Sequence, residues 1–333
     1  MNVEFSELFS DFQVIAIPLH NTFRGINVRE VAIFKGQAGW SEFSPFLEYD
    51  TEESAAWLQA AVSEAHYPWP TLHRDQVRVN ATLPQVPAEK VAGIMARFPG
   101  TRTVKVKVDT FAESQERIDA VRDALPEVRI RLDINGGWLL QQARDELFKF
   151  HHRFGEIFEY IEQPCNELSD LKILRGEIPY KIAADESIRK ILNVDPAAVR
   201  ESVDIAIIKW APLGGISAAR KLISQLNMPV TISSALDTGI GISHGAALAA
   251  SLEKAPLDCG LGTVALLESD ILTPPLLPRD GSIHVTRRNP DPVLLEKYRA
   301  SDDRQKWWSD RVNRIWRELV RQNFLNELNE EER

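Results

Sequence analysis

Short apolar runs alternate with stretches of helical period along most of the chain. From residue 77 these runs begin roughly 25 residues apart, which is the length of one strand-plus-helix unit. Between them, segments such as 113–125 place Ile118, Val121 and Leu125 on one apolar face of a helix. The runs that we predict to be strands are 77–83, 104–108, 128–133, 157–162, 180–185, 204–209, 229–233 and, more weakly, 259–265.

Regular alternation of strands and helices predicts an α/β fold with a parallel sheet. Closed barrels and open doubly wound sheets both have this alternation. The glycine fingerprint that usually opens a dinucleotide site in doubly wound folds is missing after the first predicted strand. We therefore expect a closed barrel, in which functional side chains gather at the carboxyl ends of the strands.

The first 75 residues predict a separate α+β unit. Segments 12–17 and 27–34 are predicted to be strands joined by a turn-rich connection at 18–25, and 52–64 is predicted to be a helix. Two prolines within 66–70 then oppose continuation of either kind of element.

The domain boundaries follow from these breaks. We place an N-terminal α+β domain at 1–75, a barrel domain at 76–289 and a tail at 290–333. The tail is predicted to form charged helices, and we expect Trp307, Trp308 and Trp316 to pack it on the N-terminal domain.

Composition and charge exclude several classes of protein. Of the 333 residues, 44% are hydrophobic and 26% are charged, which argues against a disordered or fibrous chain. The net charge of −9 and the pI near 5.4 disfavour nucleic acid or an anionic membrane surface as a partner. No apolar run reaches the roughly 18 residues that span a bilayer, and no signal peptide is apparent, so we expect a cytoplasmic protein.

The cysteines, Cys165 and Cys259, are expected to be free, and a monomer is compatible with the sequence.

Three of the predicted strands end in carboxylates, namely Asp133, Glu162 and Asp185. In a barrel these side chains meet at one end, where like charges raise one another's pKa unless a cation joins them. Oxygen ligation without His or Cys is typical of a hard ion. We therefore predict a Mg²⁺ site, with Mn²⁺ as a possible substitute.

Lysines occupy two further predicted strands. Lys105 and Lys107 share one face because side chains alternate along a strand, and Lys209 lies four strands later, across the ring. Two neighbouring cations lower each other's pKa, which brings one lysine toward the neutral form that a general base needs. Metal and lysine together predict removal of the α-proton of a small carboxylate substrate, with the ion stabilising the ene-diolate.

The same residues form motifs of a known family. The combination of Lys105-x-Lys107, Asp133-x-Asn135, Glu162-Gln-Pro164, Asp185-Glu186 and Lys209 resembles the site of the enolase superfamily, specifically its muconate-lactonizing subgroup. Gly39-Trp-Ser-Glu42 is similar to the G-W-G-E segment of the family's capping domain, although Ser41 departs from the usual glycine. The resemblance spans nearly the whole chain.

The resemblance implies a fold and roles for individual residues. It implies a modified TIM barrel, (β/α)7β, with an N-terminal α+β capping domain whose loop near 19–26 closes over the substrate. Lys107 would take the α-proton and return it to a departing hydroxyl on the same face, while Lys209 would hold the developing anion from the other face. The implied Mg²⁺ ligands are Asp133, Glu162 and Asp185, with Asn135 and Glu186 orienting them. The implied substrate contacts are Gly215, Ser233, Ser234, Gly260, Leu261 and, from the capping loop, Arg24.

Several functions remain open at this point. Segments 232–237, 239–243 and 260–263 resemble members that dehydrate a hydroxycyclohexadiene carboxylate. The nearest alternative is a 1,1-proton transfer, as in an N-succinylamino acid racemase or a dipeptide epimerase, which also needs both Lys107 and Lys209. An epimerase usually has a D-x-D motif at the last strand, and 259–262 lacks it. A Schiff-base lysine at 209 and a catalytically inactive binding barrel are the alternatives from other classes.

Overall fold

The N-terminal part of the chain forms a three-stranded antiparallel sheet covered by a helix. The computed structural model describes residues 8–190 and 195–321. β1 (Ser10–Phe23) pairs with β2 (Ile26–Lys35), which pairs with β3 (Trp40–Phe43). Helix α2 (Thr51–His66) begins after Asp50, whose side chain accepts a hydrogen bond from the Glu53 amide at 2.9 Å.

The connection predicted at 18–25 is shorter in the structure. β1 continues to Phe23, so only Arg24 and Gly25, with φ of +50° and +77°, form the turn of a long hairpin. The prediction was wrong because the polar residues between Pro18 and Phe23 were taken as a loop, whereas they lie along an edge of the hairpin. The hairpin thereby carries Phe23 and Arg24 outward at its tip.

Among the described residues, seven parallel strands form the barrel wall. In spatial order they are β5 (Ala81–Leu83), β6 (Thr103–Lys107), β7 (Arg129–Asp133), β8 (Phe158–Glu162), β9 (Ile182–Ala184), β10 (Ile205–Ile208) and β11 (Val230–Ile232). The first predicted strand is divided, because β4 (Gln76–Arg78) leaves the barrel and pairs with β12 (Ser282–His284).

A short eighth segment closes the ring. Cys259 forms a parallel bridge to Val79, and Gly260 forms one to Ser233, with the Gly260 amide donating to the Ile232 carbonyl at 2.8 Å. The predicted eighth strand is therefore reduced to these residues, and the rest of it becomes the 3-10 helix η3 (Thr263–Leu266). A (β/α)7β modified TIM barrel with an N-terminal capping domain is confirmed.

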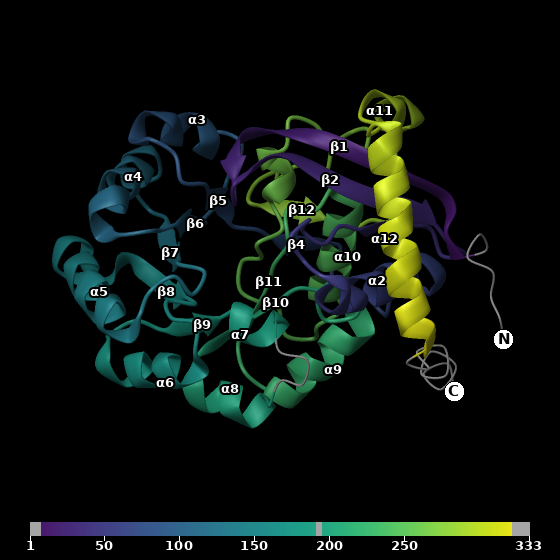
Figure 1. Ribbon diagram of the computed structural model, residues 1–333. Coiled ribbons are helices and arrows are strands. Elements are labelled where there is room, and N and C mark those ends of the chain that lie inside the picture. The colour runs from purple at the N-terminus through teal and green to yellow at the C-terminus, as the bar shows by residue number, and fades with distance from the viewer. Residues whose placement is uncertain (1–7, 191–194, 322–333) are drawn as a thin grey trace.

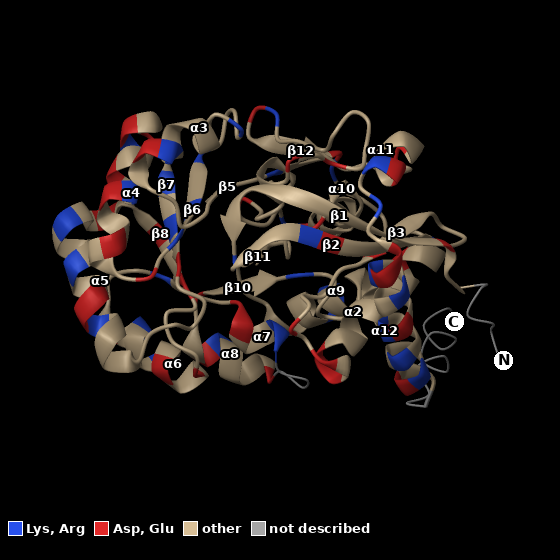
Figure 2. Cartoon of the chain, turned by 45° about the horizontal axis from the view of Figure 1, so that its top comes forward, with Lys and Arg blue, Asp and Glu red and all other residues tan. Residues whose placement is uncertain are grey.

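Helices cover the outside of the barrel, as Figure 1 shows for α3 to α6, α8 and α9. Basic and acidic residues are interspersed along outer helices such as α4 and α5 (Figure 2). Two helices between 186 and 202 were not predicted, namely α7 and α8, and residues 191–194 between them lie outside the description. The barrel-side helices are η1 (Ala88–Lys90), α3 (Val91–Met95), α4 (Phe111–Ala124), α5 (Leu140–Phe154), η2 (Gly155–Ile157), α6 (Leu168–Glu177), α7 (Glu186–Arg189), α8 (Pro196–Ser202), α9 (Ile216–Leu226) and α10 (Gly239–Ala250).

The C-terminal helices lie against the N-terminal sheet and α2. After α11 (Pro292–Lys297), α12 (Asp302–Arg321) crosses α2 in Figure 1. Trp308 is fully buried and donates to Glu30 of β2 at 2.7 Å, and Arg311 donates to the carbonyls of Phe46 and Tyr49. The division at 75/76 and 289/290 stays a prediction, and residues 1–7 and 322–333 of it lie outside the description.

Trp308 is expected to be a main support of this packing. Trp308→Ala should lower the free energy of unfolding by about 3–5 kcal/mol, because it empties a buried indole site and removes one of the hydrogen bonds to Glu30, which keeps those from Arg304. Urea unfolding followed by circular dichroism measures the change. Val293→Ala is the control, since that side chain is 74% exposed and should change stability by less than about 0.5 kcal/mol. A loss below about 1 kcal/mol for Trp308→Ala would show that α12 adds little to the folded unit.

In the described part of the chain, no helix combines the length and the apolar character that a membrane crossing requires. Cys165 and Cys259 are free and buried, as predicted.

Candidate active site

The strand register brings the predicted lysines and carboxylates to one end of the barrel. Lys107 of β6 lies beside Asp133 of β7, which lies beside Glu162 of β8. The Asp133 Oδ2 atom is 2.7 Å from Lys105 Nζ and 2.6 Å from Lys107 Nζ, and Lys105 also reaches Glu162 at 3.0 Å. Both lysines therefore point into the barrel, as their alternation predicted.

A second ion-pair group lies across the ring, around Asp185 at the end of β9. Its Oδ2 atom is 2.6 Å from Lys209 Nζ, directly after β10. Arg189 of α7 approaches Asp185 at 3.3 Å and donates to Glu186 at 2.7 Å.

Asn135 connects the two groups. It accepts a hydrogen bond from Lys107 at 2.6 Å and donates to Glu186 at 3.1 Å. Asn135 and Glu186, the residues expected to orient the metal ligands, are thus in contact with each other, and Asn135 also contacts Lys107.

Burial and close charges shift the pKa values of these groups. Burial lowers the pKa of Lys107, with Asp133 opposing the shift and Lys105 adding to it. Burial acts on Lys105 in the same direction, but Asp133 and Glu162 outweigh it and raise the pKa of Lys105. The prediction that the two lysines lower each other's pKa is therefore met by Lys107 and not by Lys105.

The carboxylates differ in the same way. Burial and the neighbouring Asp133 raise the pKa of Glu162 to about 7. Burial acts to raise the pKa of Asp185 as well, but Lys209 and Arg189 outweigh it and lower that pKa to about 2. The negative charge of Glu162 is consequently less well compensated by neighbouring cations than that of Asp185.

The donor set of this site fits a hard divalent cation. Among the described residues the carboxylates do not form a ready-made coordination sphere, because ammonium groups of Lys105 and Lys209 pair with them. Each nevertheless keeps a buried oxygen without a hydrogen bond, namely Asp133 Oδ1, Glu162 Oε2 and Asp185 Oδ1. Asp185 Oδ1 still has the Arg189 guanidinium at 3.3 Å. Buried carboxylate oxygens without hydrogen bonds are costly, and a cation bound by oxygen ligands would satisfy all three.

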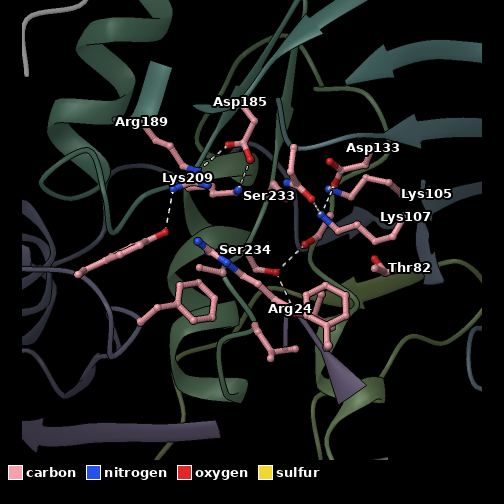
Figure 3. Close-up of a pocket in the computed structure, with 18 of the residues that line it drawn as sticks. Arg24, Thr82, Lys105, Lys107, Asp133, Asp185, Arg189, Lys209, Ser233 and Ser234 are labelled. Carbon is pink, nitrogen blue, oxygen red and sulfur yellow. Dashed lines mark hydrogen bonds and ion pairs between the residues drawn. The ribbon is translucent and has the colours of Figure 1, made fainter. Parts of the chain in front are cut away.

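Apart from Glu162, these side chains line a pocket between the barrel and the capping domain (Figure 3). Lys105, Lys107 and Asp133 lie on one side of it in this view, and Lys209, Asp185 and Arg189 on the other. The capping residues that line it are Phe23, Arg24, Phe46, Tyr49 and Trp57. The cavity is about 50 Å³, whereas pockets for organic ligands usually measure about 300–1,000 Å³. The cavity is therefore smaller than the volume that an organic ligand usually fills.

The predicted substrate contacts fall into two groups. Ser233, Ser234, Gly260 and Arg24 line the pocket, and the Arg24 guanidinium lies 4.1 Å from the centre of the Phe46 ring. Gly215 does not line it but faces α2, where an added Cβ would lie 3.3 Å from Glu64 Oε1.

Leu261 does not line the pocket either. Its fully buried side chain packs in the core, where a Cβ at Gly245 would lie 2.7 Å from Leu261 Cδ2.

The sequence analysis missed several pocket residues, among them Thr82 and Arg189 of the barrel and Phe46, Tyr49 and Trp57 of the cap. Thr82 lies near the end of β5, so the strand-end rule that found Asp133 would also have found it. Arg189 has no comparable signal, because it lies on α7, a four-residue helix that was not predicted. Its guanidinium also donates to the Tyr49 hydroxyl at 3.1 Å and so joins the barrel to the cap.

Comparisons with known proteins agree with this geometry. A family model described as enolase C-terminal domain-like matches residues 88–290, and one described as enolase N-terminal domain-like matches 14–65. The o-succinylbenzoate synthase of Mycobacterium bovis (strain BCG / Pasteur 1173P2) is 43% identical over 319 residues, or 94% of this chain and 96% of the relative.

Two solved structures are similar in fold. The muconate lactonizing enzyme from Pseudomonas fluorescens, complexed with muconolactone, has a TM-score of 0.72 at 20% identity and covers 87% of this chain and 98% of its own. The dipeptide epimerase from Enterococcus faecalis V583, complexed with Mg and L-Leu-L-Tyr, has a TM-score of 0.68 at 21% identity and covers 84% and 97%. At 20–21% identity these two structures show the fold alone. The relative that is 43% identical over 94% of the chain shows the family. The chain therefore belongs to the o-succinylbenzoate synthase family of lyase-type enzymes within the enolase superfamily.

Proposed function

We propose that the chain is a Mg²⁺-dependent hydro-lyase that dehydrates 2-succinyl-6-hydroxy-2,4-cyclohexadiene-1-carboxylate to 2-succinylbenzoate, a step of menaquinone biosynthesis. The observation that carries the proposal is that Lys107 and Lys209, from opposite sides of the ring, line one pocket that also contains Asp133 and Asp185. The 43% identity to relatives of that name supports the choice of substrate.

Lys107 is the base and then the acid of this reaction. Its neutral amine removes the proton from the carbon that carries the substrate carboxylate, which gives an ene-diolate and an ammonium group. The same ammonium returns the proton to the departing hydroxyl on that face of the ring. The C–O bond breaks, water leaves and the ring becomes aromatic, so the lysine ends in its starting form.

The other charged residues hold the anion that this proton transfer creates. Lys209 lies across the pocket, where its ammonium group stabilises the developing negative charge and contacts the ring face. Asp133, Glu162 and Asp185 would hold Mg²⁺, which supplies positive charge to the substrate carboxylate. Asn135 holds Lys107 in place through a hydrogen bond and is itself held by Glu186.

The succinyl arm is proposed to lie toward the far wall of the pocket. Ser233, Ser234 and Gly260 form this wall, and Arg24 supplies a cation from the hairpin tip. Gly215 and Leu261 lie away from the pocket, so we assign them no contact with the substrate.

Conversion of the cyclohexadiene substrate is expected to require the divalent ion. EDTA should reduce turnover of the purified protein by about a hundredfold or more, and added Mg²⁺ or Mn²⁺ should restore it. The appearance of the aromatic product, followed by absorbance, measures the rate. Turnover that EDTA leaves unchanged would contradict the metal site while leaving the substrate assignment in place.

A racemase activity is the second candidate, because two lysines on opposite faces of one pocket are also what a 1,1-proton transfer needs. The same protein should therefore be assayed on N-succinyl amino acids by optical rotation. A racemase rate above the dehydration rate would reverse the order of the two functions.

A further inference from the structure

A buried glutamate of the capping domain binds the first turn of a barrel helix. Glu42 of β3 is 1% exposed, and its Oε2 atom accepts from the amides of Thr238 at 3.1 Å and Gly241 at 3.0 Å, and from the Thr238 hydroxyl. Its Oε1 atom accepts from the Ser44 hydroxyl at 2.8 Å. A side chain from a different domain thus satisfies amide donors at the N-terminus of α10 that have no partner within the helix.

The sequence around this contact leaves space for the glutamate. A Cβ at Gly241 would lie 2.6 Å from Glu42 Cδ, so any larger residue at 241 would displace the carboxyl group. Glu42 also ends the Gly39–Glu42 motif, a motif for which the proposed reaction has no role.

A buried arginine of the cap holds the preceding loop. Arg29 of β2 is 2% exposed and donates to the carbonyls of Leu236 and Ala235, both at 3.1 Å, and to that of Ser44. Leu236 has a φ of +64°, a conformation that a branched side chain rarely adopts without support. Arg29 and Glu42 therefore fix the two ends of segment 235–241.

This segment continues directly from the wall of the active-site pocket. Ser233, Ser234, Ala235 and Leu236 all line the pocket and connect β11 to α10. Neither Arg29 nor Glu42 lines it, so neither touches the space that a substrate would fill.

We propose that Arg29 and Glu42 are positioning residues through which the capping domain sets the shape of the 233–236 wall and hence the affinity for the succinyl carboxylate. The proposal rests on the proposed function, since it takes that wall as the place where the carboxylate arm binds. It assigns the cap a second role besides lining the pocket, because these contacts belong to its β-sheet and not to the hairpin tip.

Hydrogen bonding, rather than charge, accounts for the action of Glu42. Burial and the neighbouring Asp237 raise the pKa of Glu42 to about 8, so this carboxyl group retains a proton near neutral pH. Glutamine has the shape of a protonated carboxyl group, with one oxygen for the α10 amides and an NH₂ group toward Ser44, whose hydroxyl then accepts instead of donating. Glu42→Gln should therefore preserve the contact that Glu42→Ala removes.

Steady-state kinetics on the cyclohexadiene substrate provide the first test. Glu42→Ala should raise KM by about tenfold, with kcat within about threefold of wild type because Lys107 and Lys209 lie on other strands. Glu42→Gln should restore KM to within about twofold of wild type. Ser44→Ala is the matched control, since it removes one hydrogen bond to Glu42 and leaves those to α10 in place, so KM should not change. An unchanged KM in folded Glu42→Ala, or equal defects in the Gln and Ala variants, would overturn the proposal.

Hydrogen exchange without substrate provides a test that does not depend on the reaction. The amides of Thr238 and Gly241 should exchange at least about tenfold faster in Glu42→Ala than in Glu42→Gln. Equal rates would overturn the contact itself, even if the wild-type protein proved inactive on the cyclohexadiene and the proposed function failed.

A milder variant covers the case in which Glu42→Ala does not fold. Thr238→Val removes the hydroxyl that donates to Glu42 and that accepts from the Ile240 amide at 3.2 Å, and it should raise KM by about threefold. An unchanged KM in that variant would count against the proposal in the same way.

Discussion

Lys107→Ala is expected to lower turnover of the cyclohexadiene substrate by about a thousandfold, within the range that general acid–base catalysis contributes. Burial lowers the pKa of this lysine, so it supplies more neutral amine near pH 7 than an exposed lysine would. Mg²⁺ affinity should not fall, because the change removes a cation 2.6 Å from Asp133 and no oxygen ligand. Turnover and Mg²⁺ titration by calorimetry therefore separate the base from the metal site.

The controls for this variant follow from the same chemistry. Lys107→Arg keeps a cation but is no base at neutral pH, so it should be as inactive as the alanine variant. Lys172→Ala, at a 56% exposed side chain of α6, should leave turnover unchanged. Residual activity of Lys107→Ala within about tenfold of wild type would reject Lys107 as the base.

The core of the candidate site was predictable because parallel strands impose it. If 104–108, 128–133 and 157–162 are neighbouring parallel strands, their carboxyl ends lie at the same end of the barrel. The observed register pairs Lys107 with Asp133 and Asp133 with Glu162. Alternation along β6 likewise directs Lys105 to the same side as Lys107. The alternation of side chains along a strand and the alignment of strand ends therefore predict which lysines and carboxylates come together, without any tertiary information.

The contacts between the cap and the barrel were not predictable in this way. Arg189 reaches Tyr49 from α7, a helix too short to have a periodic signal, and Glu42 reaches α10 across 196 residues of sequence. The hairpin was misjudged for a similar reason, because β1 continues through an irregular stretch after Pro18 until Phe23 pairs with Ile26. The family resemblance implied Gly215 as a substrate contact, yet its loop faces α2 and it does not line the pocket. In each case packing between distant segments decides the outcome.

Asp185→Asn is expected to weaken Mg²⁺ binding by about tenfold or more, because one of the three carboxylates loses its charge. In the structure Asp185 balances Lys209 at 2.6 Å and Arg189 at 3.3 Å, so the change also leaves two buried cations facing the place where the ion would bind. Loss of turnover alone would not identify the cause, since Lys209 loses its partner as well.

Direct binding of the ion separates these effects. Mg²⁺ at about a hundred times its dissociation constant should stabilise the wild-type protein by about 2.7 kcal/mol, and this increment should shrink in Asp185→Asn. Glu201→Gln makes the same change of carboxylate to amide at a 65% exposed side chain of α8 and should retain the full increment. Because the three oxygens without hydrogen bonds are the reason to infer a cation here, an Asp185→Asn variant that titrates with Mg²⁺ like the wild type would remove Asp185 from the site.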